Sequence, residues 1–229
     1  MITPDLPFDF PPYRLSGTVY GTAMNHPQAL LDMGDAVLAP PYRGAPRYPV
    51  LYIKPRNTFS ASGQSVDVPP DFKGVCVGVN LGLVVGRFAH RVHEVEAHSF
   101  LAGYVMVHDF QLPHESFYRP SIRFIARDGY CAFGQMVVPA HAVPDPDALE
   151  TRLWVDGELV QRASTSGRVR NTARLLADVT EFMTLRPGDV LMLGASSAAP
   201  IVAPGQEVVS EIDGLGRMEN TITSMEAAS

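Results

Sequence analysis

Short apolar runs separated by glycine and proline fill most of the chain, a pattern typical of β-strands. The strongest run is Val75–Arg87, where nearly every position is apolar and glycines stand at positions 78, 82 and 86. An Asp156-Gly157 pair between apolar runs predicts a hairpin. The other predicted strands are Leu15–Tyr20, Val50–Pro55, Val66–Val68, Ala102–Asp109, Ala132–Val138, Leu149–Val155, Val190–Gly194, Gln206–Ile212 and Arg217–Ile222.

Helical spacing of apolar residues is clearest over Asn171–Met183, where Leu175, Leu176, Val179, Phe182 and Met183 recur on one face. A second helix is predicted over Pro27–Met33, since proline suits the first helical position. A third, short helix is predicted over His93–Leu101. Many strands and few helices predict an α+β, β-dominated domain with a mixed sheet.

The chain has 229 residues, of which 46% are hydrophobic, so it can bury one substantial core but not two ordinary enzyme domains. We expect a lead-in segment with a short helix over residues 1–45, the main domain over 46–224 and a tail over 225–229. The content of 19 glycines and 20 prolines agrees with many turns.

The formal net charge is −6, and no run of Lys or Arg occurs, which argues against nucleic-acid or anionic-membrane binding. Cys76 and Cys131 lie far apart in apolar stretches, which favours reduced thiols. The N-terminus is acidic and proline-broken, unlike a signal peptide. No segment is long and apolar enough to span a bilayer. We therefore expect a cytoplasmic protein whose partners are small molecules or proteins.

Several motifs occur together in a characteristic order: Leu51-Tyr-Ile-Lys-Pro55, Ala102-Gly-Tyr-Val-Met-Val-His-Asp109, Arg127-Asp-Gly-Tyr-Cys131, Phe182-Met-Thr-Leu-Arg-Pro-Gly-Asp-Val-Leu191 and Pro204 to Gly216 with Asn220-Thr221. This ordered set resembles the fumarylacetoacetate hydrolase superfamily over nearly the whole chain. Within it, Asn25-His26 and His108 to Pro120 resemble the N-terminal half of the isomerase/decarboxylases of 4-hydroxyphenylacetate (homoprotocatechuate) degradation.

The resemblance implies a mixed β-roll with short peripheral helices, assembled as a homodimer or as a hetero-oligomer with a paralogous subunit. It implies a small 2-oxo dicarboxylate as substrate and Mg²⁺ or Mn²⁺ as cofactor. A hard divalent cation can chelate the carboxylate and ketone oxygens of such a substrate and stabilise the enolate formed on decarboxylation or proton shift.

The metal ligands implied by the resemblance are a Glu-x-Glu pair on the strand that contains Val75–Arg87 and an aspartate that matches Asp109. Gly78 and Asn80 stand where the two glutamates belong. One carboxylate holds a strongly hydrated cation poorly, so metal binding is expected to be weak or absent. Asp109 is the remaining candidate ligand, and its alternative role is to turn the chain after its strand.

The resemblance also assigns His26 to catalysis, although the glutamate that pairs with this histidine in the family is missing. Without family context, His26 is interpreted as a residue that caps a helix. Lys54 and Arg119 are candidates for binding a substrate carboxylate. His114, Glu115 and Tyr118 complete the substrate-binding cluster, and solvated charges or ion pairs are the alternative interpretation.

Two functions follow from these residues. The chain is either a metal-assisted isomerase/decarboxylase subunit of aromatic catabolism, or a catalytically degenerate structural or regulatory partner of a paralogue with the full ligand set. The missing glutamate pair favours the second function, because a fold does not carry its activity when the site residues change.

Overall fold

The computed structural model describes residues 17–114 and 122–225. Its strands are β1 (Val19–Ala23), β2 (Val50–Lys54), β3 (Phe59–Ala61), β4 (Ser65–Val68), β5 (Val75–Val85), β6 (Leu101–Gln111), β7 (Cys131–Phe133), β8 (Val138–Pro139), β9 (Glu150–Val155), β10 (Glu158–Ser164), β11 (Val190–Met192), β12 (Ile201–Val202), β13 (Glu207–Ile212) and β14 (Gly216–Ser224). The helices are α1 (Pro27–Met33), α2 (Ile122–Ile125) and α3 (Thr172–Phe182), with 3-10 turns η1 (Gly34–Val37), η2 (Arg56–Thr58), η3 (Glu94–Phe100) and η4 (Ala140–Ala142).

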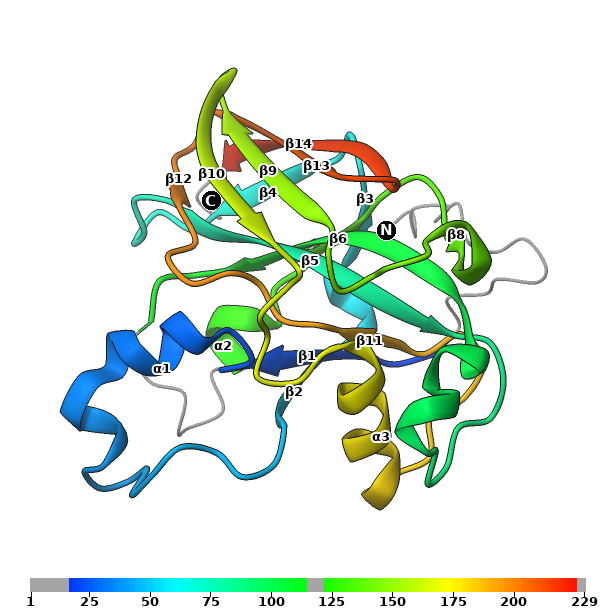
Figure 1. Ribbon diagram of the computed structural model, residues 1–229. Coiled ribbons are helices and arrows are strands. Elements are labelled where there is room, and N and C mark those ends of the chain that lie inside the picture. The colour runs from blue at the N-terminus through cyan, green and yellow to red at the C-terminus, as the bar shows by residue number, and fades with distance from the viewer. Residues whose placement is uncertain (1–16, 115–121, 226–229) are drawn as a thin grey trace.

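The described strands form two mixed sheets. The larger sheet has the order β2-β1-β11-β5-β6-β7-β3, and β12 and β8 pair with β5 and β6. The smaller sheet has the order β10-β9-β13-β14-β4. Figure 1 shows β13, β14 and β4 on one side of β5 and β6, while β1, β2 and β11 lie on the other side. The larger sheet therefore curls into a half-barrel, which confirms the predicted β-dominated mixed roll.

The two long central strands are buried on both faces, so their sequence is apolar at almost every position. On β5, the odd-numbered residues from Val75 to Leu83 join the main core, which also contains β9, β13, β14 and α3. Val84 of β5 and Val105 and Val107 of β6 point the other way, into a second cluster inside the curl of the larger sheet. The interior of this curl is where the polar site develops.

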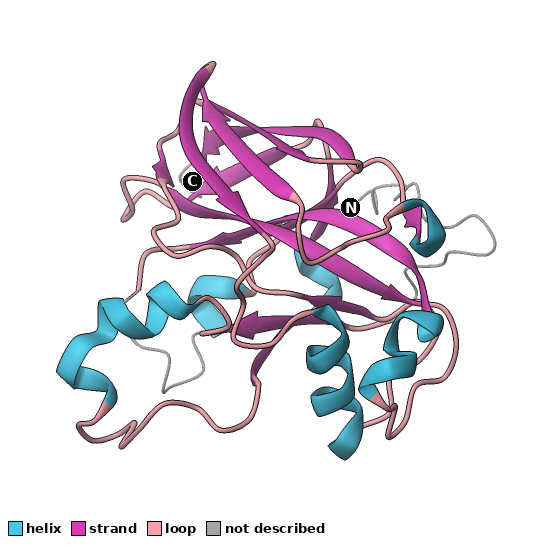
Figure 2. Ribbon diagram, viewed as in Figure 1, coloured by secondary structure: helices cyan, strands magenta, loops and turns pink. Residues whose placement is uncertain are grey.

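Helix α3 matches the predicted amphipathic helix. The side chain of Asn171 caps it by accepting a hydrogen bond from the Arg174 backbone N–H, at 2.8 Å. Leu175, Leu176 and Val179 are buried in the main core, as their spacing predicts, whereas Phe182 at the last turn is exposed. Figure 2 shows the helices at the periphery of the strands.

Three predicted elements differ from the structure. The strand expected over Leu15–Tyr20 is β1, four residues later, because pairing with β2 and β11 outweighs the low strand propensity of Gly21 and Ala23. The strand expected over Ala132–Val138 is split into β7 and β8. The helix expected over His93–Leu101 is the 3-10 turn η3. None of the described helices has the length and apolarity needed to cross a bilayer.

Candidate active site

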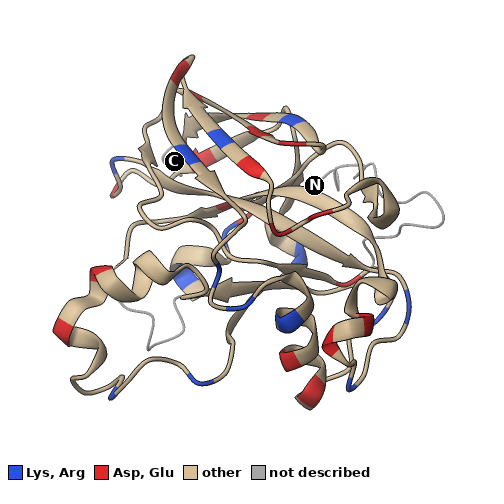
Figure 3. Cartoon of the chain, viewed as in Figure 1, with Lys and Arg blue, Asp and Glu red and all other residues tan. Residues whose placement is uncertain are grey.

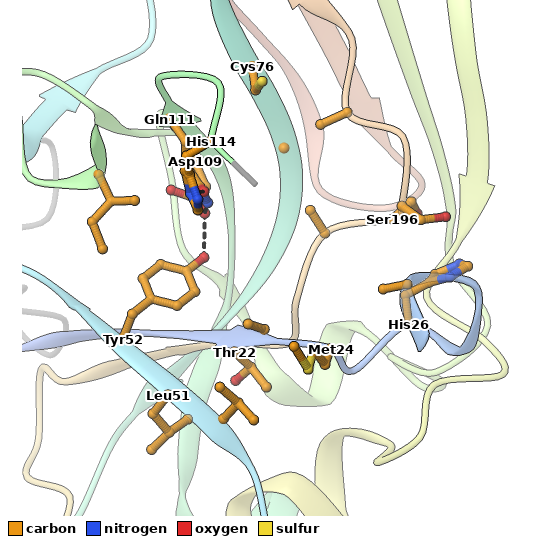
Figure 4. Close-up of a pocket in the computed structure, with 18 of the residues that line it drawn as sticks. Thr22, Met24, His26, Leu51, Tyr52, Cys76, Asp109, Gln111, His114 and Ser196 are labelled. Carbon is orange, nitrogen blue, oxygen red and sulfur yellow. Dashed lines mark hydrogen bonds between the residues drawn. The ribbon is translucent and has the colours of Figure 1, made fainter. Parts of the chain in front are cut away.

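A cavity of about 680 Å³ opens where β1, β2, β5 and β6 meet the segment that follows β11. Its walls are largely apolar, with a few polar side chains that converge on the interior. The polar lining residues are Thr22, His26, Tyr52, Asp109, Gln111, His114, Ser196 and Ser197. Such a combination is typical of a small-molecule site. Figure 4 shows Asp109, Gln111 and His114 on one side of the cavity and His26 and Ser196 on the other.

The Asp109 carboxylate, which is buried, accepts three polar contacts from side chains. Lys54 Nζ lies 2.5 Å from Oδ1. Gln111 Nε2 donates to Oδ2 at 2.8 Å, and the Tyr52 hydroxyl donates to the same oxygen. Burial, followed by the charge of Asp109, raises the pKa of Tyr52 well above its usual value, so the hydroxyl remains a donor. Both hydrogen bonds thus go to Oδ2, while Oδ1 is paired with the charge of Lys54 and has no hydrogen-bond partner among the described residues.

Lys54 lies beneath Asp109 and is completely buried. Its ammonium also donates to the backbone carbonyls of Phe110, Ile125 and Tyr130, at 2.8, 2.9 and 3.1 Å. Four protein acceptors around one ammonium favour a positioning role, in which Lys54 fixes the orientation of Asp109. Direct contact between Lys54 and a substrate carboxylate remains a prediction.

Tyr52 reaches Asp109 only because β1 carries a glycine opposite it. Tyr52 pairs with Gly21 in the β1–β2 ladder. A Cβ atom at Gly21 would lie 2.0 Å from the Tyr52 ring. Any side chain at position 21 would displace the ring, so Gly21 is required for the hydrogen bond between Tyr52 and Asp109.

His26 caps α1 at the opposite side of the cavity. Its Nδ1 accepts a hydrogen bond from the Gln28 backbone N–H at 3.2 Å, so the neutral ring carries its proton on Nε2. Burial and, next, the nearby charge of Arg168 lower the pKa of His26, while Asp32 acts in the opposite direction. The helix-capping interpretation of His26 is confirmed, and its place in the cavity wall leaves a catalytic role open as a proposal.

His114 is on the Asp109 side of the cavity. Its Nε2 lies 3.2 Å from Gln111 Oε1, and its ring stacks on Phe124. Gln111 thus links His114 to Asp109. Glu115, Tyr118 and Arg119, which the sequence assigns to substrate binding, lie outside the described residues.

His108 does not enter the cavity, although it directly precedes Asp109. Its Nδ1 lies 2.9 Å from Asn220 Oδ1 and its Nε2 lies 2.6 Å from Ser210 Oγ. Asn220 Nδ2 donates to the carbonyls of Ala61 and Gln64, so Asn220 Oδ1 must accept from His108 Nδ1. All three side chains are buried, and they link the two sheets. This Ser-His-Asn arrangement is structural, since no substrate can reach it.

Tyr52, Gln111 and Arg168 are site residues that the sequence reasoning missed. Tyr52 and Gln111 each stand two residues from a predicted site residue, Lys54 and Asp109. Side chains two apart on a strand share a face, so this spacing was an available signal. Arg168 lies in the loop that follows β10, and the sequence gives no local sign of its role.

Comparison with known proteins fixes the family. Residues 18–223 match the family described as fumarylacetoacetate (FAA) hydrolase C-terminal. The chain belongs to this family. It is 36% identical over 208 residues to the 4-hydroxyphenylacetate degradation bifunctional isomerase/decarboxylase of Escherichia coli, covering 91% of the chain and 47% of that protein. The chain thus spans about half the length of this curated relative.

Solved structures of the family share the fold. The crystal structure of 5-carboxymethyl-2-hydroxymuconate delta-isomerase from Mycobacterium smegmatis superposes with a TM-score of 0.77 at 24% identity, covering 94% of this chain and 82% of that one. Maleylpyruvate hydrolase from Sphingobium sp. SYK-6, in complex with manganese(II) and pyruvate, gives a TM-score of 0.74 at 22% identity, covering 91% and 71%. That structure therefore holds a divalent metal.

The residues of this chain do not fit that metal. Gly78 pairs directly with Asp109 between β5 and β6, so the register places two of the positions that the resemblance implies as ligands beside each other, one of them without a side chain. Asn80 uses its carbonyl oxygen to accept from the Gly194 backbone N–H at 2.9 Å. No group of three or more His, Cys, Asp or Glu side chains in the described ranges is arranged to hold a metal ion.

Proposed function

We propose that this chain is the metal-free subunit of a two-subunit enzyme of aromatic catabolism, a 2-hydroxyhepta-2,4-diene-1,7-dioate isomerase / 5-oxopent-3-ene-1,2,5-tricarboxylate decarboxylase. A paralogous subunit carries the metal in this proposal. The observation that supports it best is the ion pair of Asp109, in which Lys54 supplies the positive charge that a cation would supply. Gly78 and Asn80 stand where the resemblance implies two acids.

The length of the chain agrees with this proposal. It spans about half of the bifunctional isomerase/decarboxylase that it resembles, so about half of that relative lies outside the match. Decarboxylation and proton shift of a 2-oxo acid both pass through an enolate, which requires electrostatic stabilisation. A paralogue with the Glu-x-Glu pair supplies that stabilisation, while this chain contributes a cavity and an assembly partner.

Within this proposal, His26 is the candidate proton-transfer residue, since its Nε2 carries the proton of the neutral ring. Asp109, positioned by Lys54, and His114 form the opposite wall and contact the substrate. We expect the assembly to reside in the cytoplasm, with residues 46–224 as the main domain and 1–45 and 225–229 as the flanking segments.

Isothermal titration with Mn²⁺, with and without oxalate, tests the metal-free assignment. We expect no tight binding to the lone chain. Decarboxylase and isomerase assays are then run on the chain alone, on the paralogue alone and on the mixture. Only the samples that contain the paralogue should convert the substrate, and the mixture should give the highest rate. Tight Mn²⁺ binding together with turnover by the lone chain would contradict the proposal.

An autonomous enzyme is the second candidate function. The cavity itself favours it, because His26, Asp109 and His114 line one cavity of a size suited to a small acid. The same assays separate the two functions. Turnover by the lone chain supports autonomous catalysis, and its dependence on Mn²⁺ shows whether this catalysis uses a metal.

A further inference from the structure

Ala195 lines the cavity, and two side chains contact the segment Gly194–Ala195 from behind. Each of them has a buried nitrogen donor without a hydrogen-bond partner among the described residues. Asn80 is the first. It is 1% exposed, and its Oδ1 accepts from the Gly194 N–H. Its Nδ2 has no hydrogen-bond partner among the described residues. Asn80 shares a face of β5 with Gly78, which lines the cavity.

Arg168 is the second of these side chains. Its Nη1 lies 3.5 Å from the Ala195 carbonyl, its Nη2 donates to the Ser164 carbonyl at 3.1 Å, and its buried Nε has no partner within the described ranges. Burial lowers the pKa of Arg168 to about 10, which still leaves it charged at neutral pH. Arg168 lies behind the cavity wall, because the Ala195 carbonyl that it approaches belongs to a residue that lines the cavity.

Thr22 supplies a third group at the same place. It lines the cavity, is 4% exposed, and its Oγ1 has no partner in the portion of the chain that the structure describes. Its carbonyl oxygen would lie 2.8 Å from a Cβ atom at Gly194, so Thr22 adjoins the segment that Asn80 and Arg168 hold.

These groups have a common electrostatic character. Buried donors without acceptors are costly, and a buried guanidinium without a carboxylate is more so. A carboxylate bound at this wall would offer oxygen acceptors to these donors, and Asn80 Nδ2 lies only 3.7 Å from the position of a Cβ atom at the cavity-lining Gly78. A divalent cation would instead be repelled by the guanidinium. Of the two positions that the resemblance assigns to glutamate ligands, Asn80 presents an amide donor that suits a carboxylate, and Gly78 presents no side chain.

We propose that Asn80 Nδ2, Thr22 Oγ1 and Arg168 form a metal-independent subsite for one carboxylate of a small 2-oxo dicarboxylate. The inference rests on the proposed function for the substrate class but not for the partner subunit. The second carboxylate then faces the Asp109 side of the cavity, where His114 lies.

Titration calorimetry with 2-oxoglutarate as the probe, in the presence of EDTA, tests the subsite. We expect the wild-type chain to bind the probe without metal. Asn80→Asp keeps the oxygen that accepts from Gly194 but replaces the free donor by an acceptor, so binding should weaken at least tenfold. Because the new buried carboxylate also lowers stability, binding is measured at a temperature where circular dichroism shows that the variant is folded. Arg168→Ala and Thr22→Val should also weaken binding, Arg168→Ala by at least tenfold.

Arg162→Ala is the matched control for Arg168→Ala. Arg162 is largely exposed on neighbouring β10 and loses the same charge, so its variant should bind as the wild type does. Arg168→Lys keeps the charge and should retain some of the affinity. Failure of the wild type to bind in EDTA would overturn the inference. So would Asn80→Asp and Arg168→Ala proteins whose affinity stays within twofold of the wild type.

The failures of the two proposals are distinguishable. Binding in EDTA without stimulation of the paralogue leaves the subsite standing and removes the proposed partnership. Stimulation of the paralogue without binding of the probe removes the subsite alone.

Discussion

At the scale of single residues, the buried pair of Lys54 and Asp109 is the central feature of the site. Removing one partner leaves an uncompensated buried charge, which costs more than the pair contributes. We expect Lys54→Met to lower the free energy of unfolding by about 3 kcal/mol or more. Urea unfolding followed by circular dichroism measures this change.

The exposed Lys73 is the control for that variant. Lys73→Met should change the free energy of unfolding by less than about 0.5 kcal/mol. Equal, small effects of the two variants would show that Lys54 and Asp109 are not paired.

His108 predicts how stability depends on pH. Burial lowers the pKa of His108 to about 4, against about 6.5 in the unfolded chain, although the Asn220 hydrogen bond acts in the opposite direction. Between these values the unfolded chain binds a proton that the folded chain excludes. Stability from this residue is therefore complete above about pH 6.5 and falls as the pH drops towards 4, by about 3 kcal/mol.

The measurement is urea unfolding of the wild type and of His108→Gln between about pH 4 and 7. The variant should be less stable at the upper end of this range, and its stability should fall less steeply as the pH drops. His141→Gln, at an exposed site, should follow the wild-type curve. Parallel curves for wild type and His108→Gln would contradict the prediction.

At the scale of elements, β5 explains why the metal ligands cannot simply be restored. A Cβ atom at Gly78 would lie 2.8 Å from the Ala195 Cβ, so the wall segment occupies the space that a glutamate needs. We expect Gly78→Glu with Asn80→Glu to lower the free energy of unfolding by about 3 kcal/mol or more, through overpacking, the lost bond to Gly194 and two buried carboxylates beside Asp109. Adding Ala195→Gly should recover some of this loss in urea unfolding. No recovery would show that the wall does not crowd position 78.

The sequence predicts elements better than it predicts contacts, and particular elements show why. The α3 helix and the β5 and β6 strands follow from local periodicity, because each is long and buried. The position of β1 depends on partners far along the chain, so local reasoning placed it early. The hydrogen bonds to Asp109 and the role of Arg168 depend on tertiary packing in the same way. For Tyr52 and Gln111 the two-residue spacing from Lys54 and Asp109 is a local signal, whereas Arg168 has none.

At the scale of the whole molecule, the charges of both signs are interspersed over the described elements (Figure 3), and the chemistry is confined to one end of the curled sheet. The proposal that this chain is a metal-free subunit predicts the number of metal ions in the assembled enzyme. We expect the complex of this chain with a Glu-x-Glu paralogue to bind one Mn²⁺ for each paralogue chain and none for this chain, because Lys54 and Arg168 place fixed positive charges at the corresponding site.

Equilibrium dialysis followed by elemental analysis gives the ratio of manganese to protein in the complex. The paralogue alone should show the same ratio of manganese to paralogue chain. This control shows whether the metal ligands come from the paralogue itself or are completed by assembly with this chain. A complex with one manganese for every chain would mean that assembly builds a second metal site with oxygens from elsewhere. The Asp109 carboxylate would then have to exchange a hydrogen bond for a cation, and the free subunit would be an incomplete form of an ordinary metal enzyme.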